Sequence, residues 1–175
     1  MIVSVETLAS LSEFADTDED MLKRKLLAVE SLIRSYTNNN FQNRHIRFEG
    51  YSEGSQVFGT SPYLKAGDTV QITKSDVNDG LYVLTAVDEE SVTVDGELFT
   101  VPLNRVTKVE YPAVIQEGVI NLLMWEVENR QNVGVKQETL SRHSVTYYDQ
   151  DSNNTVMGYP VALLGFLRPF MKARF

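Results

Sequence analysis

With 175 residues, 42% of them hydrophobic and 23% charged, the chain has the composition of a folded globular protein and a length sufficient for one sizeable core. The absence of cysteine excludes disulfides, thiolate metal sites and cysteine nucleophiles. Acidic residues outnumber basic ones by 24 to 16, and residues 1–43, 44–111 and 112–175 are in turn acidic, acidic and balanced, which argues against tight binding of DNA phosphates.

Two helices are expected before the asparagine run at 38–40. A short opening helix is predicted to end near Phe14, since apolar residues recur at helical spacing from Val5 onward. For a longer second helix, Asp16 or Thr17 is the expected cap, because acidic residues fill the first turn. The asparagines supply a left-handed exit near Thr37. The apolar face of this helix consists of Leu22, Leu26, Val29, Ile33 and Tyr36.

From Arg44 to Tyr111, alternating and β-branched residues replace the helical pattern. Asn–Asp–Gly and Asp–Gly sequences supply tight turns at close spacing, as small antiparallel barrels require. The segment is therefore predicted to form a compact β-barrel of about five strands. Short strands are predicted at residues 46–48, 69–72, 81–84, 91–94 and 107–109.

A second long helix is predicted after the β-rich segment. Pro112 stands where this helix would begin, and a broad apolar face continues to Arg130. Both long helices lie outside the β-rich segment, so the expected fold is α+β. In this arrangement, residues 1–43 and 112–175 form a discontinuous helical domain, which carries an inserted small antiparallel β-barrel at residues 44–111.

The C-terminal part combines an extended arm with a short helix. Residues 135–148 are predicted to form a β arm or hairpin, because their sequence is extended and ends in β-branched and aromatic residues. Tyr159 and Pro160 are expected to open a short helix over 161–167. The run Arg168–Pro169–Phe170 is expected to end it, and the residues beyond are both apolar and basic.

No pattern typical of catalysis, metal binding or cofactor binding is found. His45 and His143 lack partners at the spacing of a zinc site. Acidic runs at 16–20 and 149–153 begin like calcium loops but lack the required glycine and closing glutamate. Phosphate-binding loops and nucleophile elbows are missing. The chain is therefore predicted not to be an enzyme and to need no cofactor.

The sequence gives no indication of export or membrane insertion. Residues 1–6 lack the basic start and apolar stretch of a signal peptide. No apolar run approaches the roughly 18 residues that cross a bilayer. We therefore expect synthesis in the cytoplasm and no membrane partner.

Short motifs follow the two long helices in a fixed order. They are Gly134–Val135–Lys136–Gln137–Glu138, Ser144–Val145–Thr146–Tyr147, Gly158–Tyr159–Pro160, Leu163–Leu164 and Leu167–Arg168–Pro169–Phe170. With the Asp-rich capped helix, this order resembles the head-tail connector (adaptor) proteins of long-tailed bacteriophages. The resemblance covers residues 1–40 and 112–175. Gln137 replaces the small hydroxyl residue usual in the family, and the β-rich segment departs from the shortest members.

The resemblance implies a structural virion protein that forms a ring of about twelve copies beneath the portal, extends the DNA channel and joins head to tail. The implied partners are further copies of the chain, the portal protein and the next connector or tail-completion protein, with double-stranded DNA passing non-specifically. The implied location is the head–tail junction of the virion, and the host cytoplasm during assembly. An acidic channel wall suits this role, because a wall that bound phosphates would retain the genome.

By the same resemblance, the arm at 135–148 and the tail at 159–175 are the expected contacts with neighbouring subunits and the portal. The arm would add to a partner's sheet, and the tail would anchor through aromatic and arginine side chains. The candidate contact residues are Lys136, Glu138, Tyr147, Tyr148, Arg168, Phe170, Lys172, Arg174 and Phe175.

Two alternatives remain at the level of sequence. The β-rich segment could be a binding module for a peptide, glycan or nucleic acid, which a groove lined by Tyr51, Tyr63 and Tyr82 would support. An enzyme that uses an acidic pair such as Asp88 and Glu90 is the weaker alternative, because no activating partner is identifiable.

Overall fold

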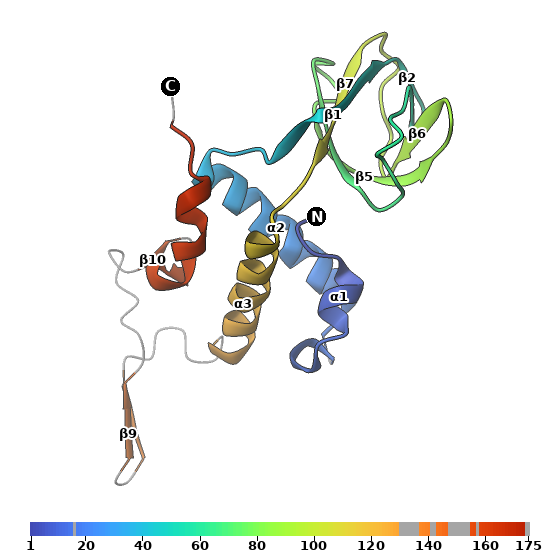
Figure 1. Ribbon diagram of the computed structural model, residues 1–175. Coiled ribbons are helices and arrows are strands. Elements are labelled where there is room, and N and C mark those ends of the chain that lie inside the picture. Colours follow the sequence, from blue (N-terminus) through green and yellow to red (C-terminus); the bar gives the residue numbers. More distant parts are fainter. Residues whose placement is uncertain (16, 130–136, 141–142, 147–154, 157, 174–175) are drawn as a thin grey trace. The chain divides into compact units, whose positions relative to one another are not determined.

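The computed structural model describes residues 1–15, 17–129, 137–140, 143–146, 155–156 and 158–173 (Figure 1). Contacts divide the chain into two units, which we call the β unit and the helical unit. The β unit comprises Met1 and Asn40–Tyr111, and the helical unit comprises Ile2–Asn39 and Pro112–Phe175. Helices and antiparallel strands together make an α+β fold.

The β unit is built on one antiparallel sheet of seven strands, in the order β1-β7-β4-β5-β6-β3-β2. The predicted strand segments lie in β1, β4, β5, β6 and β7, and the prediction missed β2 and β3. The strand bounds are β1 Gln42–Gly50, β2 Ser52–Glu53, β3 Gln56–Phe58, β4 Thr69–Thr73, β5 Gly80–Val87, β6 Ser91–Val94 and β7 Asn104–Val109.

The predicted closed β-barrel is wrong, because the sheet is open. Strands β1 and β2 form its two edges, and each pairs with a single neighbour, β7 and β3 respectively. Only Tyr51 separates the two edge strands in the chain, so they follow one another end to end instead of lying side by side. An irregularity in the register of β1, between Asn43 and Arg47, bends this edge and makes it a poorer template for another strand.

Apolar side chains, most of them from the strands, fill the core of the β unit. All nine are valine, isoleucine or leucine, and the β-branched ones made the strands recognisable in the sequence. Phe48 and Tyr82 pack against this core from its margin. The buried cluster consists of Val57, Leu64, Val70, Ile72, Leu84, Val92, Val94, Leu98 and Val106.

A buried polar residue, Asn78, ties distant segments of the β unit together. Its Nδ2 lies 2.9 Å from the Phe99 carbonyl, 3.0 Å from Asn104 Oδ1 and 3.1 Å from Ser52 Oγ. Its Oδ1 accepts a hydrogen bond from the Phe99 amide at 2.8 Å. A buried polar group is costly when unpaired, so this network fixes how the three segments pack. The sequence predicts only a turn at this position.

The helical unit contains two long helices, and most residues of their predicted apolar faces are buried, whereas Val114 and Val127 of the second helix are exposed. Leu26 and Ile33 of α2 are fully buried, as are Ile115 and Val119 of α3. The elements are α1 (Val5–Ala9), η1 (Ser12–Phe14), α2 (Glu19–Thr37), α3 (Ala113–Asn129), β8 (Gln137–Leu140), β9 (His143–Thr146), β10 (Thr155–Val156), β11 (Tyr159–Pro160) and η3 (Val161–Phe170), of which η1 and η3 are 3-10 helices.

The ends of α2 show one correct and one wrong prediction. Asn38 takes up the left-handed conformation, with a φ of 49°, directly after the predicted end at Thr37. The cap at the other end is Asp18, whose Oδ1 accepts a hydrogen bond from the Met21 amide at 2.9 Å. Thr17 is not the cap because the helix begins at Glu19, directly after Asp18. The other expected cap, residue 16, lies outside the described residues.

The last helix is longer than predicted. Pro160 is its cap, but η3 continues through Pro169 and ends at Phe170 instead of stopping at Leu167. A 3-10 helix has φ angles close to the value of about −65° that a proline ring imposes. Pro169 is the last residue but one of η3, so it disturbs only the end of this helix, whereas in a helix interior its missing N–H and its ring would break the hydrogen-bond pattern.

Candidate partner-binding surface

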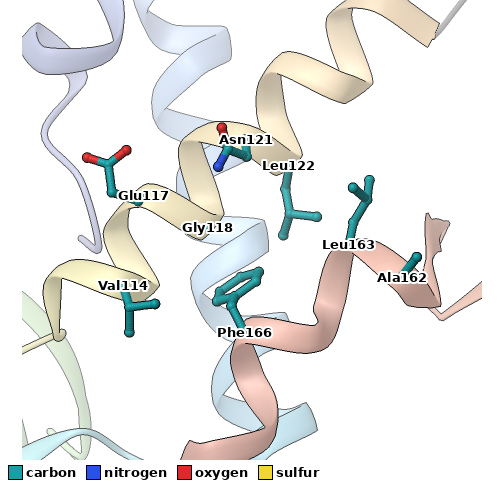
Figure 2. A pocket seen from close by; sticks show the side chains of 8 residues that line it. All are labelled: Val114, Glu117, Gly118, Asn121, Leu122, Ala162, Leu163 and Phe166. Carbon is teal, nitrogen blue, oxygen red and sulfur yellow. The ribbon is translucent and has the colours of Figure 1, made fainter.

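An open groove lies between α3 and η3 in the helical unit. It has a volume of about 340 Å³ and a largely apolar lining. Two polar side chains, Glu117 and Asn121, stand on its α3 side, and none of the described residues that line it is basic. Figure 2 shows the residues from the two helices around it. The apolar and small lining residues are Val114, Gly118, Leu122, Ala162, Leu163 and Phe166.

The groove depends on a close approach between Gly118 and Phe166. A Cβ atom placed on Gly118 would lie only 2.3 Å from Phe166 Cε2, which is well inside van der Waals contact. The ring of Phe166 therefore packs on the bare helix backbone of α3 (Figure 2). A glycine in a helix interior costs roughly 1 kcal/mol of helix propensity relative to alanine. This close packing explains why a glycine occupies position 118 in the middle of the helix.

A three-residue network fixes the start of η3 relative to both long helices. The ammonium of Lys25 on α2 forms an ion pair with Glu126 on α3, and the hydroxyl of Tyr159 donates to the other oxygen of Glu126 at 3.0 Å. The ring of Tyr159 also packs against Trp125, with centroids 6.0 Å apart. Burial, and then the nearby Glu126 carboxylate, raise the pKa of Tyr159. The tyrosine thus stays neutral and acts as a donor in this network.

The last residue of η3 and the tail residues after it are bound to the C-terminal end of α2. The Lys172 amide donates to the Thr37 carbonyl at 2.8 Å, which satisfies one of the carbonyls that a helix end leaves unpaired. Asn38 Nδ2 donates to the Ala173 carbonyl at 2.8 Å, and Asn39 Nδ2 to the Phe170 carbonyl at 3.1 Å. All three bonds use tail backbone atoms, so the exposed side chains of the tail stay available for other contacts.

The structure describes four of the nine residues predicted to contact partners. Arg168 and Lys172 are exposed, and Phe170 is half-buried. Glu138 lies in β8, which pairs with β9 as the predicted hairpin, and the register sets it opposite Val145. The remaining predicted residues lie outside the described part of the chain: Lys136, Tyr147, Tyr148, Arg174 and Phe175.

The three tyrosines that would support a binding groove in the β unit have different neighbours. Tyr51 is 46% exposed and stacks on Phe58, with ring centroids 4.3 Å apart. Tyr82 turns toward the core margin and donates its hydroxyl to the Asn78 carbonyl at 3.1 Å. Tyr63 is 70% exposed. The observed contacts therefore supply an exposed aromatic stack at Tyr51 and not a groove shared by all three.

The acidic pair considered for catalysis lies in the exposed turn between β5 and β6. The Asp88 amide donates to the Ser91 carbonyl at 2.8 Å, and the Glu90 carbonyl accepts from the Gly59 amide at the same distance. These backbone bonds make the segment a charged turn. Within the described ranges, no three His, Asp or Glu residues gather as possible metal ligands, and no helix is long and apolar enough to span a membrane.

The groove itself was not predicted from the sequence. Its two walls come from segments about 48 positions apart, so no local pattern brings them together. The one available signal was Gly118, since an isolated glycine inside an apolar helix often has a packing reason. Exposed Leu27 and Met21 on α2 were likewise not singled out.

Comparison with known proteins leaves the function to be inferred from these features. No protein-family model matches the chain, and no curated protein matches it in sequence. The chemistry of the groove, the tail and the hairpin is therefore the basis for a functional assignment.

Proposed function

We propose that this chain is a structural subunit of a bacteriophage head-tail connector. About twelve copies would form a ring beneath the portal, extend the DNA channel and join the head to the next connector or tail-completion protein. The ring would reside at the head–tail junction of the virion after assembly in the host cytoplasm. The chain would act through binding and not through catalysis.

The observation that carries this proposal is the hairpin β8–β9, which lies in the chain between α3 and the tail helix. In the part of the chain that the structure describes, its strands pair with each other and with no third strand. A single two-stranded hairpin is at best marginally stable in water. Such an element is therefore expected to gain its stability by adding to a partner, as assembly arms do.

The tail supports the same proposal. Its backbone is held on the end of α2 by the bonds to Thr37, Asn38 and Asn39, while Arg168 and Lys172 project from it as exposed side chains. Basic side chains on a preorganised backbone lose less conformational entropy on binding than those on a free tail. We assign Arg168, Phe170 and Lys172 to contact with the portal.

The acidic surface of the β unit is compatible with a position beside passing DNA. A neutral or acidic wall adds no affinity for phosphates and so lets the duplex slide. The exposed acidic residues of the β unit include Glu53, Asp76, Asp88, Glu89, Glu90, Asp95 and Glu97.

A second candidate function is favoured by the exposed aromatic stack of Tyr51 on Phe58. Phe99, 68% exposed, adds another uncovered ring to the same unit. Aromatic rings of this kind are common anchors at binding surfaces. In this alternative, the β unit would recognise a peptide or glycan and the helical unit would present it.

Affinity isolation with mass spectrometry separates the two candidates. The full chain, tagged and isolated from cells that produce the virion containing it, is expected to carry portal and tail-completion proteins with it. The double variant Arg168→Glu/Lys172→Glu is expected to lose the portal, whereas Tyr51→Ala is expected to keep it. An eluate of polysaccharide or host proteins, lost by Tyr51→Ala and kept by the tail variant, would contradict the connector and support the binding module.

A further inference from the structure

We infer that the groove between α3 and η3 receives the outer face of α2 from a second copy of this chain. This inference rests on the proposed function, because it names the contact that would join neighbouring copies in the ring. It concerns two surfaces of the helical unit that the sequence did not mark: the groove, and the exposed side of α2 around Leu27.

The groove defines the chemistry of its occupant. Its floor is apolar, so the occupant must present aliphatic side chains. Its polar rim consists of Glu117, which only accepts hydrogen bonds when ionised, and Asn121. A partner with basic side chains beside its apolar ones would complement this rim, and an acidic partner would be repelled.

The outer face of α2 has this combination. Leu27 is 48% exposed, although it lies on a helix whose opposite face is fully buried. Lys23 and Arg24 are exposed and lie four and three positions before Leu27, so they stand beside it on the helix surface. The arginine fork suits a carboxylate such as Glu117.

The dimensions of the two surfaces also agree. At a rise of about 1.5 Å per residue, the groove from Val114 to Leu122 runs for about 12 Å along α3. On α2, the helical turn from Lys23 to Leu27 covers about 6 Å and places the two basic side chains beside Leu27. This turn therefore fits within the groove in the helix-in-groove mode of recognition.

Electrostatics favours α2 over other surfaces of the same chain. Copies that each carry a net charge of −8 repel one another, so a contact between them requires local opposite charge. The tail also joins a basic residue to an exposed apolar one, at Lys172 and Met171. The backbone of the tail, however, is already bonded along the end of α2.

This contact would be heterologous, because the groove and the outer face of α2 are different surfaces. A heterologous contact repeats from copy to copy and closes into a ring when the rotation permits. A face-to-face dimer would instead use one surface twice. The proposed contact therefore generates the type of assembly that the connector function requires.

Cysteine crosslinking in trans tests the inference directly, because the natural chain contains no cysteine. One full chain carries Leu27→Cys, and a second full chain of distinguishable mass carries Ala162→Cys at the groove. The two chains are mixed, oxidised and separated by mass. This is done in two materials: the purified chains alone, and the chains isolated together with their partner proteins. We expect a heterodimeric crosslink at least about fivefold above that from Glu53→Cys paired with Ala162→Cys.

Charge reversal supplies the matched control. Arg24→Glu in the first chain is expected to lower the crosslink yield about fivefold, as exposed ion pairs allow, and Glu117→Arg in the second chain is expected to restore it. A yield no higher than the Glu53→Cys control in both materials would overturn the inference. So would preferential crosslinking of Met171→Cys to Ala162→Cys, which would assign the groove to the tail.

The outcome is separable from that of the proposed function. A chain that copurifies with the portal but gives no crosslink between α2 and the groove keeps the connector function and loses this contact. A chain that crosslinks as expected but never copurifies with a portal keeps the contact and loses the connector function.

Discussion

The β unit and the helical unit of this protein are held together in different ways. In the β unit, nine buried apolar side chains form one core on a sheet that pairs strands far apart in the chain. Asn78 adds a buried polar network. In the helical unit, buried side chains of α2, α3 and η3 form the core, and three specific sites add contacts between segments far apart in the sequence: Gly118 against Phe166, the Lys25–Glu126–Tyr159 network and the tail bonds. Substitutions at these three sites should therefore have distinct and local effects in the helical unit.

Asn78→Ala is expected to have the largest effect and to act on the β unit. It removes the partner of the Phe99 amide and of buried Asn104 Oδ1, and each buried unpaired group costs about 1–3 kcal/mol. We expect the free energy of unfolding of the β unit to fall by about 3 kcal/mol, measured by amide hydrogen exchange of β4 and β7. The control Asn43→Ala removes two exposed bonds, to Glu110 and from the His45 amide, and should change this free energy by less than about 1 kcal/mol. Equal effects of the two variants would contradict the role assigned to Asn78.

Gly118→Ala is expected to have the next largest effect and to act on the helical unit. The added Cβ meets the ring of Phe166, and overpacking of this kind typically costs about 1–3 kcal/mol. Gly165→Ala is the control, since a Cβ there meets nothing within 4 Å. We expect the two variants to differ by about 2 kcal/mol in the stability of the helical unit. Fluorescence of Trp125 reports on this unit alone, because it is the only tryptophan. Indistinguishable unfolding curves of the two variants would contradict the close packing of Phe166 on Gly118.

Tyr159→Phe tests the network that holds η3. At neutral pH the loss of the hydroxyl bond to Glu126 should cost about 1 kcal/mol. Because the pKa of Tyr159 is raised above its ordinary value of 10.0, the folded protein keeps a proton that the unfolded chain loses. The contribution of this group is therefore fully present below pH 10 and declines as the pH rises beyond it.

The wild-type helical unit should accordingly lose stability above pH 10 more steeply than the Tyr159→Phe variant, followed by Trp125 fluorescence. Parallel pH dependences of the two proteins would show that Tyr159 does not titrate differently on unfolding.

Asn38→Gly is expected to have the smallest effect on stability. Glycine keeps the left-handed conformation at the end of α2 but loses the bond from Asn38 Nδ2 to the Ala173 carbonyl. We expect a change of about 0.5 kcal/mol and a faster cleavage by trypsin after exposed Lys172. Asn38→Asp, which retains a short polar side chain without the donor, should behave alike. An unchanged cleavage rate in both variants would mean that the side-chain bond does not hold the tail.

The sequence predicted those elements whose pattern is local. The apolar residues of α2 and α3 recur every three or four positions, and β4, β6 and β7 are rich in β-branched residues, so each element is visible within its own segment. Strands β2 and β3 have two and three residues, which is too short for a pattern to emerge. The cap at Asp18 was misplaced because three alternating aspartates offered the same chemistry.

Features that join distant segments escaped the prediction. Whether the edge strands β1 and β2 close a barrel depends on the geometry of the whole sheet, and the turn motifs do not encode it. The residues around Asn78 are typical of a turn. Its hydrogen bonds to Asn104 and from the Phe99 amide, which make it part of a buried network, depend on segments more than twenty positions away. The groove likewise exists only when η3 packs on Gly118.

Localising the protein in the virion tests the proposed function most directly. An epitope inserted in the exposed turn at 88–90 avoids the tail on α2 and the amino group of Met1, which donates to Thr69. Electron microscopy of purified particles labelled with gold against this epitope is expected to place the label at the head–tail junction. Label on the capsid surface or at the tail tip would contradict the connector function. So would the absence of label from intact purified particles.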